Sequence, residues 1–144
     1  MRFLLMVKNS GASLAAYEGG AQPELSAVQA MMKFNEELLA AGAWIAGEGL
    51  HPSAKAARIS FAKGKQAKVT DGPFTEAKEL VGGFWIARFP TKQAAVDFVA
   101  RCPLPDGEIE IREIFDIGDH EDDIKAEGLA FAEKLGPGGN NPAK

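Results

Sequence analysis

The sequence predicts an α+β fold in which short strands alternate with two helices. Segments whose apolar residues recur with a period of two predict the strands, and two longer segments with helical spacing predict the helices. The chain has 144 residues, of which 46% are hydrophobic and 25% are charged. These values are typical of a single globular domain.

The first half of the chain predicts two strands around one helix. Residues 3–7 form a compact apolar strand, and the Gly- and Ala-rich stretch that ends at Gly20 predicts a surface loop. Apolar residues recur at helical spacing over residues 24–41, and Gly42 marks the end of this helix. A short second strand is expected over residues 43–47.

The second half predicts a hairpin, a strand, a helix and a last strand. Residues 57–62 and 66–70 flank a Lys-Gly-Lys turn, and residues 81–89 form the next strand. Thr91 caps a helix that must end before Pro103, and residues 108–115 give the last strand.

Without the inserted hairpin, this order is βαββαβ, the split pattern of ferredoxin-like domains. Two helices on one face of a sheet leave the other face without cover, so we expect a homodimer whose sheets pack as a dimeric α+β barrel. The apolar residues expected on that uncovered face are Phe3, Leu5, Ile86, Ile109 and Ile111.

Three parts are predicted along the chain. The main domain covers residues 1–118, a helical extension of the same domain covers residues 119–135, and residues 136–144 are a flexible tail rich in Gly and Pro. The acidic run at residues 119–123 is interpreted as a helix start and not as a metal site.

A turn after residue 70 carries the most informative motif. Residues 71–79 read DGPFTEAKE, and the Asp-Gly-Pro order predicts that a strand ends there, because Gly allows unusual φ and Pro fixes its own. Together with residues 47–50, 82–84 and 100–103, this motif resembles the DGPF group of the YCII-related domain family. The resemblance implies a ferredoxin-like domain that pairs into a dimeric barrel, an activity that is largely undefined, and an association with extracytoplasmic-function sigma factors in bacteria.

Asp71 and His51 are the candidate proton-transfer pair, since a carboxylate can orient a histidine that titrates near neutrality. The alternative is that Asp71 bonds its own turn and His51 lies in a surface loop. The family resemblance implies a histidine on the first helix as the partner of an aspartate. That helix has no histidine here, and Met31 stands at the matching position.

A polar cleft with an apolar wall is the candidate ligand site. Its predicted residues are Glu48, Phe74, Glu76, Lys78, Glu79 and Trp85, with Phe84 beside Trp85. The alternative is that the charged residues among them form a solvated turn that starts at Thr75.

Composition argues against several functions. The net charge of −4 and the pI of about 5.2 disfavour nucleic-acid binding, and no apolar run is long enough to span a membrane or to serve as a signal peptide. A single cysteine, Cys102, agrees with a cytoplasmic location. No motif for a metal or a cofactor is present.

Two functions remain: a small-molecule binding protein, with enzymatic activity left open, and a regulatory interaction module that uses Phe131 and Leu135.

Overall fold

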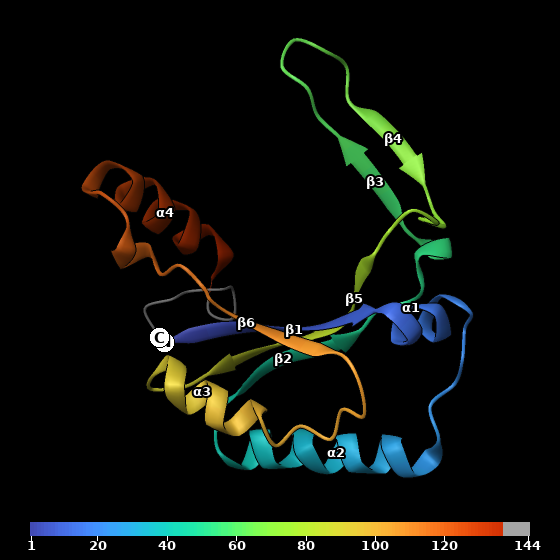
Figure 1. Cartoon of the computed structure of the whole chain (residues 1–144). Helices are drawn as coiled ribbons and strands as arrows, with labels where there is room; N and C mark the ends of the chain where they lie inside the picture. Colours follow the sequence, from blue (N-terminus) through green and yellow to red (C-terminus); the bar gives the residue numbers. More distant parts are fainter. Residues whose placement is uncertain (137–144) are drawn as a thin grey trace. The chain divides into compact units, whose positions relative to one another are not determined.

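The computed structural model describes residues 1–136, which divide into two compact units, Met1–Glu113 and the segment from Ile114 onward. The first unit contains a four-stranded antiparallel sheet in the order β2-β5-β1-β6 (Figure 1). Its strands are β1 (Arg2–Ser10), β2 (Trp44–Gly49), β5 (Glu79–Arg88) and β6 (Glu108–Glu113). The mixed α+β class with antiparallel pairing is therefore confirmed.

Two helices pack on one face of this sheet, α2 (Leu25–Ala40) and α3 (Lys92–Val99) (Figure 1). The Thr91 side chain caps α3 by accepting a hydrogen bond from the Ala94 backbone N–H at 3.1 Å, as predicted. Burial of apolar surface between the helices and the sheet forms the core. Its buried members are Phe3, Leu5, Phe34, Leu38, Ala43, Trp85, Ala87, Phe89, Ala95 and Val99.

The predicted composition of the uncovered sheet face is wrong. Phe3 and Leu5 are fully buried on the face that the helices cover, and Ile109 and Ile111 pack against the same core. Ile86 does lie on the opposite face, because it pairs with Leu4 in the register of β1 and β5. The strand period of two explains the error: odd residues of β1 face the helices, and even residues face away.

The segment predicted as a surface loop contains a helix, α1 (Gly11–Glu18). The Ser10 backbone N–H donates to Ser13 Oγ at 3.1 Å, and the Ser13 hydroxyl donates back to the Ser10 carbonyl at 2.9 Å. Three alanines within α1 favour a helix without creating any apolar periodicity. A search for periodicity therefore could not find this element.

The predicted hairpin is present as a separate two-stranded antiparallel sheet of β3 (Ala57–Ser60) and β4 (Lys68–Asp71). Every residue of both strands is exposed. The strands are shorter than predicted, and the chain between them turns at Gly64, whose φ is +71°. The hairpin extends away from the main sheet (Figure 1).

The second unit contains a short 3-10 turn, η2 (Ile117–Asp119), and the helix α4 (Asp122–Leu135). Asp122 and Asp123 lie in the first turn of α4, where carboxylates interact favourably with the helix dipole. The predicted tail, residues 136–144, lies outside the described residues except for Gly136. Within residues 1–136, the helices are too short or too polar to cross a membrane.

Candidate functional site

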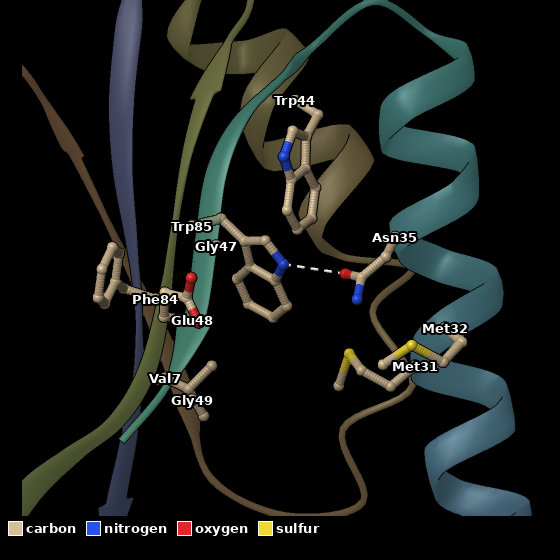
Figure 2. A pocket seen from close by; sticks show the side chains of 11 residues that line it. Val7, Met31, Met32, Asn35, Trp44, Gly47, Glu48, Gly49, Phe84 and Trp85 are labelled. Carbon is tan, nitrogen blue, oxygen red and sulfur yellow. Dashed lines mark hydrogen bonds between the residues drawn. The ribbon is translucent and has the colours of Figure 1, made fainter. Parts of the chain in front are cut away.

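A cavity of about 320 Å³ lies between α2 and the sheet (Figure 2). Two tryptophans, the only two in the chain, line it together with two methionines of α2. The full lining is Val7, Met31, Met32, Asn35, Trp44, Gly47, Glu48, Gly49, Gly83, Phe84 and Trp85. Its walls are thus mainly apolar and aromatic, which is typical of small-molecule sites.

Asn35 is the polar side chain that lies in this cavity. The Trp85 indole Nε1 donates a hydrogen bond to Asn35 Oδ1 at 2.9 Å (Figure 2). Because an indole N–H can only donate, this bond fixes which end of the Asn35 amide faces Trp85. The amide nitrogen Nδ2 therefore points the other way, toward Met31 and Met32 (Figure 2). Within residues 1–136, Nδ2 has no hydrogen-bond acceptor.

A β-bulge brings the two tryptophans to the same wall. The register between β2 and β5 shifts between Trp44 and Ala46, so that Trp44 and Gly47 both face α2 although an even number of residues, two, separates them. A Cβ at Gly47 would lie 2.7 Å from atoms of both indole rings. Glycine at this position is therefore what allows the two rings to approach each other.

Packing holds Trp85 in place. Its side chain is 7% exposed, and its ring meets Phe34 edge-on, with ring centroids 5.9 Å apart at 66°. Such edge-to-face pairs stabilise an aromatic cluster beyond the area that they bury. The hydrogen bond to Asn35 fixes the remaining polar atom of the ring, so the cavity wall is formed before any ligand binds.

Of the predicted ligand residues, Trp85 faces this cavity, and Glu48 lies on the neighbouring strand of its wall. Glu48 pairs with Phe84 in the register of β2 and β5, whereas Gly47 pairs with Trp85. The carboxylate of Glu48 therefore lies across the sheet from Trp85, beside the Phe84 ring (Figure 2). The sequence did not single out Asn35, although a polar residue one turn after Met31, within the apolar stripe of α2, was a usable signal.

The other predicted ligand residues lie elsewhere. Phe74 is buried, and the guanidinium carbon of Arg58 lies 3.8 Å from the centroid of its ring. Arg58 also pairs with Glu76 at 3.2 Å, while Lys78 is exposed. The Thr75 segment is a turn, closed by a hydrogen bond from the Ala77 N–H to the Phe74 carbonyl at 3.1 Å.

Glu79 takes part in an ion cluster around Lys8 instead of lining a cleft. Lys8 Nζ lies 2.7 Å from Glu110, 3.2 Å from Glu79 and 3.2 Å from Glu108. The hydrogen bonds to these carboxylates, led by Glu110, raise the pKa of Lys8 and keep it charged. The cluster links β1 to both of its neighbouring strands.

Ser53, which the sequence did not single out, connects the turn that follows Asp71 to α1. It is the buried polar residue of this region, at 3% exposure. Its hydroxyl donates to the Glu18 carboxylate and accepts from the Phe74 N–H at 2.9 Å, and its own N–H donates to Glu18 Oε1 at 2.8 Å. The bonds from Ser53 lower the pKa of Glu18. Ser53 thus ties three segments together.

Gly72 has a different role from the one predicted. It is absent from the residues with positive φ, so unusual backbone geometry is not its function. A Cβ at this position would overlap the Ser53 carbonyl. The Gly72 N–H also donates to the Ala56 carbonyl at 2.8 Å, so two backbone segments meet closely at this glycine.

His51 and Asp71 are both exposed, and within residues 1–136 no hydrogen bond or ion pair joins them. The backbone carbonyl of His51 accepts a hydrogen bond from the Tyr17 hydroxyl at 2.7 Å, which anchors the loop. This bond does not involve the imidazole. Asp71 ends β4, opposite Ala57. Their predicted proton transfer stays a prediction.

Within residues 1–136, no group of three His, Cys, Asp or Glu side chains is arranged to hold a metal ion. Cys102 is half-buried beside α3, and burial raises the pKa of its thiol. A raised pKa disfavours the nucleophilic thiolate.

Solved structures and one protein family are similar to this chain. The structure of 5-chloro-2-hydroxyhydroquinone dehydrochlorinase (TftG) from Burkholderia phenoliruptrix AC1100, in complex with 2,5-dihydroxybenzoquinone, is similar with a TM-score of 0.46 and 15% identity. The similarity covers 84% of this chain and 100% of that chain. No curated protein matches the sequence. The model of the YCII-related domain matches residues 1–118, and the chain therefore belongs to the YCII-related domain family.

Proposed function

We propose that this protein binds a largely apolar small molecule with a hydrogen-bond acceptor in the cavity between α2 and the sheet. The observation that carries the proposal is the fixed orientation of Asn35. Its Oδ1 accepts from Trp85, which leaves the two N–H groups of Nδ2 for a ligand. A carbonyl oxygen is the simplest group that accepts such a bond.

The surroundings of Nδ2 strengthen this assignment. The indole rings of Trp44 and Trp85 offer it no acceptor, and the methionine sulfurs are only weak acceptors. A ligand that supplied one would gain about 0.5–1.5 kcal/mol from a neutral hydrogen bond. The cavity volume of about 320 Å³ is at the small end of ligand sites, and two indole walls favour a flat molecule.

Binding, and not proton transfer, is the function that this geometry supports best. Glu48 is the ionisable residue of the lining, and its carboxylate lies on the far side of the strand (Figure 2). Met31, which stands where the family resemblance places a histidine, lies in the cavity wall. A thioether cannot transfer a proton. Catalysis by Asp71 and His51 is a separate proposal, which loss of ligand-induced stabilisation in Asp71→Asn would support.

Two matched ligands test the binding proposal. Acetophenone and ethylbenzene have the same ring and the same two-carbon substituent, and differ in the carbonyl oxygen. We expect calorimetry to show tighter binding of acetophenone, with shifts of both indole N–H signals in nuclear magnetic resonance spectra. If neither compound binds, or if both bind equally well, the role assigned to Asn35 is wrong.

The variant Asn35→Asp is the matched control. Aspartate keeps an oxygen that accepts from Trp85 Nε1 but replaces the two donors of Nδ2 with a second acceptor. The preference for acetophenone should therefore disappear while the Trp85 indole signal keeps its hydrogen-bonded position. A preference that survives in Asn35→Asp would show that the carbonyl binds elsewhere.

We also propose that the first unit is a ferredoxin-like domain of the DGPF group that forms a homodimer. The strand order and the two helices on one face support the fold. The face away from these helices carries an apolar strip of Leu4, Met6, Phe84 and Ile86, all only partly exposed. Sedimentation of wild type and Ile86→Glu tests the pairing: the variant should be monomeric, and a monomeric wild type would contradict the proposal.

One observation favours a second function, a regulatory module that binds an extracytoplasmic-function sigma factor. Helix α4 exposes large apolar side chains that its own unit does not bury, with Phe131 at 61% and Leu135 at 42% exposure. Exposed apolar patches mark interaction surfaces. Binding of a purified sigma factor of this class to wild type but not to Phe131→Glu would support this function, and absence of binding to either would refute it.

A further inference from the structure

We propose that the ligand of the tryptophan cavity is elongated, and that an unbranched apolar chain runs from its head group into a second cavity next to it. This inference rests on the proposed binding function and specifies its ligand class. The second cavity has a volume of about 620 Å³ and belongs to the same unit, Met1–Glu113. It lies between the first half of α2 and the loop that follows α3.

One wall of the second cavity comes from Pro103, Leu104 and Pro105. The two prolines have no backbone N–H, and the N–H of Leu104 donates to the Cys102 carbonyl at 2.8 Å. No backbone donor of this wall is therefore left for a ligand. The wall is also stiff, because each proline fixes its own φ.

The opposite wall comes from Pro23, which precedes α2, and from Ala27 and Val28 in the first turns of α2. Pro23 has no backbone N–H, and the Val28 N–H donates to the Glu24 carbonyl at 3.1 Å. A peptide lying along the proline wall would find no backbone donor there for its carbonyl groups, and each buried polar group left unpaired costs about 1–3 kcal/mol. An alkyl chain has no such groups, and it is the occupant that these walls fit.

Met31 and Met32 line both cavities and separate them. Methionine side chains are unbranched and rotate about three bonds, so they adapt to irregular neighbours. Met32 is 51% exposed and therefore has room to move. Asn35 follows these methionines on α2. An alkyl chain whose head group binds at Asn35 therefore needs only a change of methionine rotamers to reach the second cavity.

The charge of Glu24 limits which end group the alkyl chain of the ligand can carry. Glu24 is the ionisable residue in the lining of the second cavity, and it is exposed at the start of α2. A carboxylate there repels an anionic end group. The ligand class is therefore a carbonyl-bearing, preferably aromatic head group with an unbranched alkyl chain that carries no anionic end group.

A homologous series of phenyl ketones tests the chain: acetophenone, butyrophenone, hexanophenone and octanophenone. The head group is constant, and only the chain grows. Full burial of one methylene strengthens binding by about fourfold, so we expect the dissociation constant measured by calorimetry to fall by about twofold to fourfold per added methylene. Affinity that does not change with chain length overturns the inference, while tight binding of acetophenone still supports the proposed function. Failure of every ketone to bind overturns both.

A pair of variants tests where the alkyl chain of the ligand binds. Ala27→Phe fills the second cavity from an exposed helix position, and Ala40→Phe places the same side chain on an exposed position of α2 outside both cavities. Ala27→Phe should leave the affinity for acetophenone unchanged and abolish the gain with chain length, whereas Ala40→Phe should keep that gain. A gain that persists in Ala27→Phe would show that the chain lies elsewhere and overturns the inference.

Discussion

Replacing Gly72 with alanine should destabilise the protein more than its single added methyl group suggests. The new Cβ would overlap the Ser53 carbonyl, so the two backbone segments must separate. Separation weakens the bond from the Gly72 N–H to Ala56 and the bond from the Phe74 N–H to Ser53 Oγ. It also exposes part of the Phe74 ring, which is now 7% exposed.

The expected loss follows from these contacts. Two hydrogen bonds and partial exposure of one aromatic side chain together correspond to about 3 kcal/mol of unfolding free energy. For a chain of this size, that lowers the melting temperature by about 10 °C. Thermal and urea unfolding would measure the effect. Gly49→Ala is the matched control, because its Cβ meets no atom within 4 Å and its φ is not positive. Equal stability of the two variants would refute the close-contact explanation.

Other perturbations test the remaining contacts. Ser53→Ala should lower the free energy of unfolding, measured with urea, by about 2 kcal/mol, since it removes the hydroxyl that joins two segments. The hydrogen bonds from Ser53 lower the pKa of the Glu18 carboxyl. Their contribution to the free energy of unfolding is therefore complete above the ordinary pKa of 4.5, and it is lost as the pH falls through the lowered pKa. The stability of Ser53→Ala should therefore fall less on acidification than that of the wild type. Gly47→Ala should push the two indole rings apart, change both indole N–H signals and weaken acetophenone binding by about tenfold. Arg58→Gln should lower the free energy of unfolding by about 1 kcal/mol, which is the strength of a cation–π contact. An unchanged melting temperature would show that the contact with Phe74 does not stabilise the fold.

The elements that the sequence predicted well are those whose periodicity reflects burial. β1 alternates because one side of the strand faces α2 and α3, and the stripe of α2 follows its contact with the sheet. Helix α1 was missed because it has no buried residue and hence no stripe. Which side of β1 the helices cover cannot be read from alternation alone, so Phe3 and Leu5 were assigned to the wrong face.

The candidate site was harder to predict because its geometry depends on a break in the strand period. Trp44 and Gly47 share a face only through the bulge at Ile45, and no local sequence signal announces that bulge. Trp85 was identified as a wall residue, but its polar partner Asn35 lies fifty residues away on α2. Long-range pairs of this kind appear only when the sheet and the helix are packed together.

The turn of residues 71–79 and the cavity differ in physical role, and this difference explains why the turn does not lead to the site. In residues 71–79, the distinctive positions serve the backbone: Gly72 permits a close approach, and Phe74 is buried while its N–H binds Ser53. Contacts of this kind tolerate few substitutions. The cavity is lined mainly by residues whose types are common in any core, and a substitution at a lining position such as Met31 would change its chemistry with little effect on the fold. Variants can therefore keep this turn and differ in the ligand, which makes Met31 and Asn35 better guides to the specificity of the proposed site than Asp71.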